Sequence, residues 1–354
     1  MTQSYRNILI LFVLLIFTFV SCKKDSDNSE DTANSQATIQ EPEKDFFSTV
    51  EHMGVCYGPY HHDGQAPGTA IPKSQIETDL ALIAKNFDFF RTYTVADGMD
   101  QVVEVAKSKS LEVALGVWCY PGNEASTKAD IDVAVTLAKQ YPNTVSCIVI
   151  GNETNVPGNN YVAPATVATY MDYTKTKLGS TAIPISACIT GAGAANKNAS
   201  SRDDYCGPIL QKCKNLNAVH HQVILLNIYP YFAPGSNPAD ITANMQWSYN
   251  NGMSNAEKNF GLTVVIGEIG WPSGTKDNGT HTSRENPTNE GINFNATLKW
   301  VDGNNYLNQA YNSFWFEMFD EPWKVGEPNG VGPSWGIYEK NGATTPKFTI
   351  PPLQ

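Results

Sequence analysis

Eight short segments rich in aliphatic, β-branched and aromatic residues recur along the chain, and this recurrence constrains the fold more than any other feature. They cover residues 54–57, 89–94, 112–118, 146–153, 185–190, 223–229, 263–268 and 313–319. They begin about 37 residues apart on average, which leaves room for a helix in every gap. Several are continuously apolar, as is typical of strands that are covered on both faces of a parallel sheet.

The gaps between these segments carry helical patterns. Ser74 and Glu77 have the spacing of a capping box. Apolar residues recur every four positions over 129–141, and a further helix is predicted from Pro164. Eight alternations of strand and helix predict a single (β/α)8 TIM barrel. An open doubly wound sheet is the alternative, but the only candidate phosphate loop, residues 191–196, lacks the third glycine of that fingerprint.

The charge balance excludes several classes of partner. The 354 residues include 24 Lys and Arg against 35 Asp and Glu, which gives a formal net charge of −11. Nucleic-acid binding requires a basic surface, so neither nucleic acid nor another anionic polymer is expected as a ligand. The content of 41% hydrophobic and 17% charged residues is that of a globular protein. We expect one monomeric folded domain over residues 49–354.

The N-terminal residues predict export and lipid attachment. Residues 8–20 form an apolar run that is too short to cross a bilayer but typical of a signal peptide. Ser21 and Cys22 follow it and resemble a bacterial lipoprotein box; an ordinary cleaved signal is the alternative. We therefore predict a signal peptide over residues 1–21, lipidation at Cys22 and a flexible acidic tether over residues 22–48. The mature protein would be attached to the outer membrane of the cell envelope by its lipid alone, on the surface or the periplasmic face.

The remaining cysteines and the paired histidines give no clear sign of a metal site. Cys206 and Cys213 lie close enough in sequence to pair in an oxidising compartment, although six cysteines allow fifteen connectivities. His61 and His62 fall in the first predicted loop after a strand, where a solvated position is expected.

Two glutamates end apolar segments that are far apart in the sequence. Glu153 closes the fourth segment and Glu268 the seventh, each close behind a glycine. In a barrel, catalytic groups project from the C-terminal ends of the strands. A carboxylate is costly to bury without a partner or a task, and no basic residue accompanies either glutamate in its segment. Two carboxyl groups that face one cleft are what glycosidic cleavage requires, because one must protonate the leaving oxygen while the other attacks the sugar or activates water.

Six motifs in and around these segments resemble those of glycoside hydrolase family 17, the β-1,3-glucanase family of plants, fungi and bacteria. They are Gly54-Val55-Cys56-Tyr57-Gly58, Arg91-Thr92-Tyr93, Gly151-Asn152-Glu153, Asn227-Ile228-Tyr229-Pro230-Tyr231-Phe232, Gly267-Glu268-Ile269-Gly270-Trp271-Pro272-Ser273 and Phe319-Asp320-Glu321-Pro322-Trp323-Lys324. They follow one another in the family order, and the last is more similar to the fungal-like branch than to the plant enzymes. Ile269 is a departure, since the family usually carries Thr or Ser there.

The resemblance implies that Glu153 is the general acid/base and Glu268 the nucleophile of a retaining reaction. In such enzymes the two carboxyl groups lie about 5–5.5 Å apart, and a covalent glycosyl-enzyme forms. The resemblance also implies that Asn152 bonds the 2-hydroxyl of the sugar under attack. Neighbouring residues of a strand point to opposite faces, so we predict a bulge or bend that brings Asn152 and Glu153 to the same cleft.

The resemblance further implies a set of substrate-binding residues around this pair. They are the aromatic residues Tyr57, Tyr93 and Tyr229, and an acidic–basic pair at the rim of the cleft, Glu321 and Lys324. A plain surface ion pair is the alternative for those last two. Trp271 is also expected to line the cleft, because sugars lay their apolar faces on aromatic rings.

The expected activity is retaining hydrolysis of a laminarin-type β-1,3-glucan polysaccharide or oligosaccharide, with no metal or organic cofactor. A transglycosylase that uses the same two glutamates is the alternative, because loops that build the acceptor site decide between water and sugar. A non-catalytic surface glycan-binding lipoprotein would not need both Glu153 and Glu268. Related barrels that cut β-1,4 links share an Asn-Glu pair and a distant Glu, but lack the Glu-x-Gly-Trp-Pro-Ser run over residues 268–273. Endo or exo action and tolerance of branches stay open.

Overall fold

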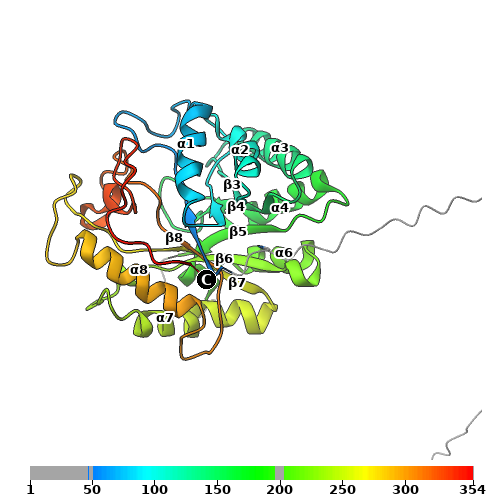
Figure 1. Cartoon of the computed structure of the whole chain (residues 1–354). Helices are drawn as coiled ribbons and strands as arrows, with labels where there is room; N and C mark the ends of the chain where they lie inside the picture. Colours follow the sequence, from blue (N-terminus) through cyan, green and yellow to red (C-terminus); the bar gives the residue numbers. More distant parts are fainter. Residues whose placement is uncertain (1–46, 48–50, 196–202, 354) are drawn as a thin grey trace, which may run out of the picture. The chain divides into compact units, whose positions relative to one another are not determined.

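Eight parallel strands close into a barrel in the order in which they occur in the chain, with β8 paired to β1. The computed structural model describes residues 47, 51–195 and 203–353. Helices are arranged around the barrel (Figure 1). This arrangement confirms the predicted (β/α)8 barrel. The predicted signal peptide, Cys22 and all of the tether except Phe47 lie outside the described residues.

Each predicted apolar segment contains one strand of the barrel. The strands are β1 (Met53–Cys56), β2 (Phe89–Arg91), β3 (Glu112–Val117), β4 (Val145–Asn152), β5 (Ile185–Thr190), β6 (Val223–Asn227), β7 (Thr263–Ile269) and β8 (Ser313–Trp315). Nearly all of their residues are buried, because helices cover the outer face and side chains fill the interior. All strands except β5 and β7 end before their apolar segments do, so the last residues of those segments belong to the loops at the C-terminal end of the barrel.

The helices lie in the gaps where the sequence predicts them, with one error at a helix start. They are α1 (Lys73–Ile83), α2 (Val102–Ser108), α3 (Glu124–Gln140), α4 (Pro164–Leu178), α5 (Gly191–Ala194), α6 (Gly207–Leu216), α7 (Thr242–Ser248) and α8 (Pro287–Val301). The capping box predicted at Ser74 is wrong. α1 follows Pro72 and has no side-chain cap, and Ser74 already lies in its first turn. α4 begins at Pro164 as predicted, where the missing N–H costs nothing.

Phe47 belongs to the folded domain and not to the tether. Its side chain is buried, with its ring stacked on Phe89 at 4.2 Å between centroids and edge-on to Phe314 at 5.5 Å. Phe89 begins β2 and Phe314 lies in β8. The chain therefore packs against the barrel two residues before the boundary predicted at residue 49.

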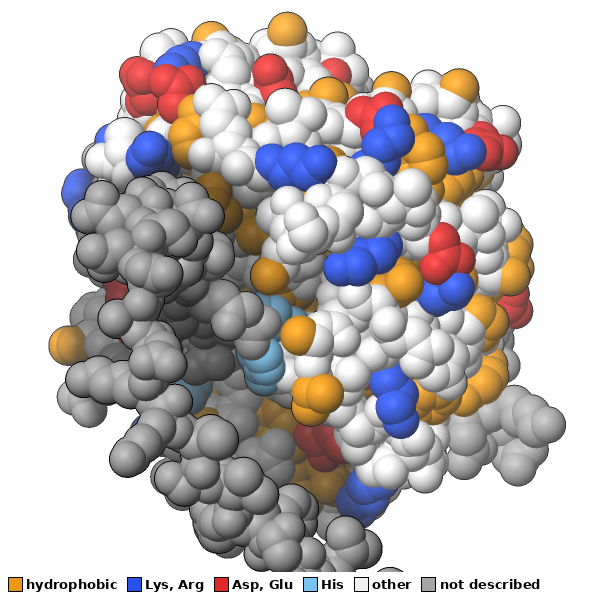
Figure 2. All heavy atoms as spheres, turned by 90° about the vertical axis from the view of Figure 1, so that its right-hand side faces the viewer, with side chains coloured by type: hydrophobic (Ala, Val, Ile, Leu, Met, Phe, Trp, Pro, Cys, Tyr) orange, Lys and Arg blue, Asp and Glu red, His pale blue; other side chains and the backbone are white. Residues whose placement is uncertain are grey.

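The described surface and cysteines add three further observations. On the face in Figure 2, basic side chains are scattered among acidic and apolar ones instead of forming one basic patch. Cys206 and Cys213 are both buried and free, so the pairing considered for them does not occur. Within the described ranges, no helix is long and apolar enough to cross a membrane.

Candidate active site

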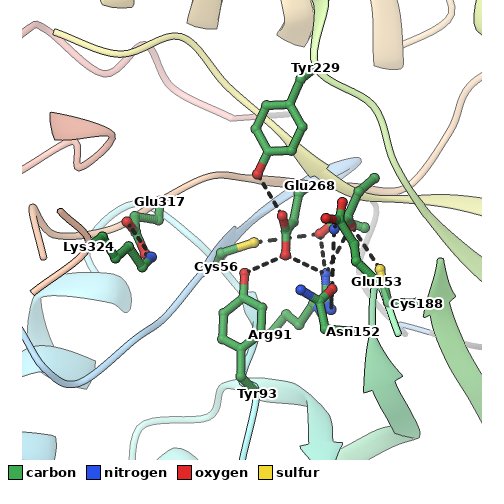
Figure 3. Close-up of polar contacts among 12 residues, drawn as sticks. Cys56, Arg91, Tyr93, Asn152, Glu153, Cys188, Tyr229, Glu268, Glu317 and Lys324 are labelled. Atoms are coloured by element: carbon green, nitrogen blue, oxygen red, sulfur yellow. Dashed lines mark hydrogen bonds and ion pairs between the residues drawn. The ribbon is translucent and has the colours of Figure 1, made fainter. Parts of the chain in front are cut away.

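The C-terminal ends of β4 and β7 bring the two predicted catalytic glutamates into one hydrogen-bonded network. Glu153 directly follows β4, and Glu268 is the last residue but one of β7. Asn227, at the end of β6, donates from Nδ2 to Glu153 Oε1 at 2.9 Å. Arg91, at the end of β2, reaches Glu268 (Figure 3), and the same nitrogen also reaches Asn227. Residues from four strands thus converge at one end of the barrel.

A bend at the end of β4 places Asn152 and Glu153 on the same side. The pairing of β4 with β5 shifts register just before Asn152. The backbone is left-handed at Gly151, with φ of 75°, and again at Glu153, with φ of 48°. Both side chains then reach one amide group, since Asn227 Nδ2 also donates to Asn152 Oδ1 at 3.2 Å. The predicted bulge is confirmed, and the positive φ of Glu153 marks a constrained residue at the site.

Glu268 is surrounded by hydrogen-bond donors. Tyr93 donates its hydroxyl to Oε1 at 2.9 Å, and Tyr229 donates to Oε2 at 2.6 Å. Arg91 Nη1 lies 3.3 Å from Oε1, in an ion pair whose two side chains are 1% and 5% exposed. Arg91 also donates to Asn152 Oδ1 at 2.8 Å. These contacts orient both carboxylate oxygens and compensate a buried negative charge.

Glu153 sits in a contrasting environment that favours its protonated form. Burial, followed by the negative charge of Glu268, raises the pKa of Glu153 to about 7. The hydrogen bond from Asn227 and the charge of Arg91 act in the opposite direction but are weaker. A carboxyl group that titrates near neutral pH beside an ion-paired carboxylate is suited to acid and base catalysis in turn.

The structure does not bring Tyr57 into this site, and the predicted sugar contact is wrong. Its side chain is fully buried and donates its hydroxyl to Asp79 Oδ2 on α1 at 2.8 Å. His61, expected in solvent, is also buried, with Nε2 2.9 Å from the same oxygen and its ring stacked on Phe319. The chain after β1 therefore directs both side chains toward buried partners and away from the cleft.

Trp271 is likewise a packing residue, so its predicted place in the cleft lining is wrong. The side chain is 0% exposed, and its indole Nε1 donates to the carbonyl of Arg284 at 3.0 Å. Its ring stands edge-on to Tyr231 at 5.2 Å. The exposed aromatic rings in this part of the fold are instead Phe232, which is 45% exposed, and Trp323, which is 36% exposed.

Glu321 and Lys324 form a buried charged cluster with Glu317 and not a surface ion pair. Lys324 Nζ lies 2.8 Å from Glu317 Oε2 (Figure 3) and 2.6 Å from Glu321 Oε2. Both carboxylates are at most 2% exposed. Burial raises the pKa of Glu317 well above its ordinary value, whereas the nearby Lys324 ammonium overcomes burial and lowers that of Glu321. The sequence analysis does not single out Glu317, although an acidic residue inside an apolar segment by itself indicates a buried charged group.

Among the described residues, no group of three or more His, Cys, Asp or Glu side chains could hold a metal ion.

A family model and several named proteins are similar in sequence to this chain. A family model described as "BtgE/BtgC glycoside hydrolase domain" matches residues 54–336. A protein of Arthroderma benhamiae named "Glucan 1,3-beta-glucosidase" is 26% identical over 315 residues, which are 84% of this chain and 89% of the relative. A protein of Aspergillus fumigatus named "Probable glucan endo-1,3-beta-glucosidase btgC" is 24% identical over 301 residues, and the match covers 79% of this chain but only 40% of that longer protein.

A solved structure supports the fold. The crystal structure of a glycoside hydrolase family 17 β-1,3-glucanosyltransferase from Rhizomucor miehei superposes with a TM-score of 0.63 at 17% sequence identity. The superposition covers 84% of this chain and 96% of that one. At this identity the likeness establishes the barrel architecture and leaves the chemistry to the side chains described above.

Proposed function

Because the chain belongs to the BtgE/BtgC glycoside hydrolase family, we propose that it cleaves laminarin-type β-1,3-glucan with retention of configuration. The observation that carries the proposal is the pairing of Glu153 and Glu268 in one network. Burial and the charge of Glu268 raise the pKa of Glu153 to about 7, and Arg91, Tyr93 and Tyr229 hold Glu268 as a carboxylate acceptor. One group is thus poised to give a proton and the other to attack.

In the first step, a carboxylate oxygen of Glu268 attacks the anomeric carbon while protonated Glu153 gives its proton to the glycosidic oxygen. The carbon–oxygen bond of the linkage breaks, an ester bond to Glu268 forms, and the shortened glucan leaves as an alcohol. Esterification removes the charge of Glu268, and with it one cause of the raised pKa of Glu153. Glu153 therefore becomes a better carboxylate base at the moment when the second step needs one.

In the second step, Glu153 takes a proton from water, and the water oxygen attacks the anomeric carbon. The ester bond breaks, Glu268 regains its charge and Glu153 its proton, so the enzyme returns to its starting state. Two inversions at the same carbon retain the β configuration.

Asn152 has the free donors that binding of the sugar requires. Its Oδ1 accepts from Arg91 Nη2 at 2.8 Å and from Asn227 Nδ2 at 3.2 Å. Arginine can only donate, so the oxygen of Asn152 must face it and the amide nitrogen points elsewhere. We assign this nitrogen to the 2-hydroxyl of the sugar under attack, where a hydrogen bond that strengthens in the transition state lowers the barrier.

Two exposed aromatic rings are candidates for the stacking role predicted for Trp271. Phe232 lies edge-on to Tyr229 at 6.0 Å between centroids, and a cavity of about 440 Å³ borders it. Trp323 donates its indole N–H to Glu321 at 3.1 Å, so its ring is held at the charged cluster. We propose Phe232 and Trp323 as the platforms for flanking glucose units.

Transglycosylation is the second candidate function. It uses the same first step, and a sugar hydroxyl replaces water in the second step. The exposed Phe232 ring next to Tyr229 favours it, since an acceptor sugar needs such a surface. Incubation with laminaripentaose in ¹⁸O-water separates the two. Hydrolysis yields new reducing ends and ¹⁸O in the products, whereas transfer redistributes chain lengths with neither.

The reaction itself is tested with linear β-1,3-glucan and with cellulose, followed by NMR detection of the first anomer released. The proposal predicts a β-anomer from the β-1,3-glucan alone and no product from a Glu268→Ala variant that still binds glycan. An α-anomer, or unimpaired turnover by Glu268→Ala, would refute it.

We also propose that the mature enzyme is a monomer attached to the outer membrane of the cell envelope through lipidated Cys22. The apolar run over residues 8–20 followed by Ser21 and Cys22 supports this proposal. Metabolic labelling with a palmitate analogue should mark the wild type and not Cys22→Ser, and light scattering should give the monomer mass. Protease treatment of intact cells then distinguishes the surface from the periplasmic face.

A further inference from the structure

Three side chains meet in the space beside Gly267, the residue before Glu268. A Cβ atom on Gly267 would lie 2.6 Å from Cys188 Sγ, 2.9 Å from Asn227 Oδ1 and 3.2 Å from Arg91 Nη1. Any side chain at position 267 would displace them, so the glycine is needed for this convergence. The three groups contact one another there, because Cys188 Sγ lies 2.8 Å and Arg91 Nη1 3.4 Å from Asn227 Oδ1.

The amide of Asn227 uses all of its hydrogen-bonding capacity in this arrangement. Its oxygen accepts from Cys188 and Arg91, and its nitrogen donates to Asn152 Oδ1 and Glu153 Oε1. Rotating the amide by half a turn would face its nitrogen toward the Arg91 guanidinium and its oxygen toward Asn152 Oδ1, and both of these contacts would become repulsive. The donors on the oxygen side therefore act together with Asn152 Oδ1, which Arg91 fixes as an acceptor, to decide which atom of the amide faces Glu153.

Cys188 is the nearer of the two donors to the Asn227 oxygen. Its side chain is buried in β5, and burial raises the pKa of the thiol, so it stays protonated and able to donate. Arg91 Nη1 is shared among Asn227, Glu268 and the carbonyl of Gly267, to which it is closest at 2.8 Å. The hydrogen bond from Arg91 alone therefore holds the Asn227 amide only weakly.

We propose that Cys188 is a positioning residue for the acid/base, holding the Asn227 amide so that its nitrogen faces Glu153. The inference rests on the proposed function for its catalytic meaning, but its structural content concerns only the titration of Glu153. The Asn227 hydrogen bond favours the carboxylate form of Glu153. Loosening the amide removes this stabilisation, so the pKa of Glu153 rises.

The test compares three substitutions in the full-length mature protein. Cys188→Val removes the donor at similar volume, with Cys188→Ala as a second variant of this type, and Cys188→Ser keeps a hydroxyl donor. Cys213→Val is the matched control, since Cys213 is an equally buried cysteine, on α6, away from the network. The titration of Glu153 is followed by NMR of ¹³C-labelled glutamate carboxyls, assigned with Glu153→Gln, and the pH dependence of kcat/KM is measured alongside.

The Val and Ala variants should raise the midpoint of Glu153 by about 0.5–1 pH unit, the effect of one lost neutral hydrogen bond. The alkaline limb of kcat/KM should move upward with it, because Glu153 must be protonated for the first step. Cys188→Ser and Cys213→Val should keep the wild-type midpoint. A folded Val or Ala variant that titrates like the wild type, or a serine variant that shifts as far as valine, overturns the proposal. Wild-type inactivity on every β-glucan would refute the proposed function, while the NMR midpoints would still decide the role of Cys188.

Discussion

The raised pKa of Glu153 predicts a cost in folding stability that depends on pH. The group titrates at about 7 in the folded chain, against 4.5 for an ordinary glutamate. The difference of about 2.5 pH units corresponds to roughly 3 kcal/mol, because one unit is about 1.4 kcal/mol. Since the folded-state pKa is the higher one, the full stability is present below pH 4.5 and is lost as the pH rises through 7. Glu153→Gln cannot ionise and should escape this loss.

Urea denaturation of the wild type and Glu153→Gln at pH 4.5 and at pH 8.5 measures the effect as a double difference. Between pH 4.5 and pH 8.5, the free energy of unfolding of the variant should rise by roughly 2–3 kcal/mol relative to that of the wild type. Glu77→Gln is the control, because Glu77 is an exposed glutamate on α1 and should give no such change. A stability difference between wild type and Glu153→Gln that is the same at both pH values would refute the account of the site.

Three further substitutions separate catalysis from packing. Tyr229→Phe removes the hydroxyl that donates to Glu268 at 2.6 Å, and should lower kcat on laminari-oligosaccharides about 10–100-fold with an intact fold; an unchanged kcat would contradict its role. Lys324→Met leaves the buried Glu321 carboxylate without its cation, and should lower the free energy of unfolding at pH 7 by about 3–5 kcal/mol in urea denaturation; a loss below 1 kcal/mol would speak against the buried cluster. Tyr57→Phe should cost about 1–2 kcal/mol of stability without changing KM, whereas a raised KM at full stability would restore Tyr57 as a sugar contact.

The barrel and its acidic pair could be predicted because both follow from regular features. Apolar segments that recur with helix-sized gaps admit few folds, and parallel strands bring their C-terminal ends together. Glu153 and Glu268 end two such segments, so their convergence follows from the topology. The conflict between strand alternation and the adjacent Asn152 and Glu153 even predicts the local bend.

The direction of side chains just beyond the strands could not be predicted in the same way. Tyr57, His61 and Trp271 all follow barrel strands, but β1 and β7 have ended or are ending there, and strand alternation no longer fixes where a side chain points. Each finds a polar partner, which only the packed structure shows.

The charged and amide side chains that contact the two glutamates form a third group of residues. Arg91 and Asn227 stand in recognisable motifs, but their effect on the glutamates depends on contacts between residues that are 74 positions (Asn227 and Glu153) and 177 positions (Arg91 and Glu268) apart in the sequence. A basic residue such as Arg91 at the end of an apolar segment does indicate a buried partner, since a lone buried charge is costly. The sequence does not show that this partner is Glu268.

Trapping the covalent intermediate tests the central claim most directly. A 2-deoxy-2-fluoro β-laminaribiosyl fluoride slows both steps but leaves the first feasible, so the glycosyl-enzyme should accumulate and be found by mass spectrometry of peptic peptides. The account predicts a single label, on Glu268. If a natural linkage replaces the activated fluoride, the wild type should form the glycosyl-enzyme more slowly at pH values above 7. A label on any other residue, or turnover that releases an inverted product with no label at all, would contradict it.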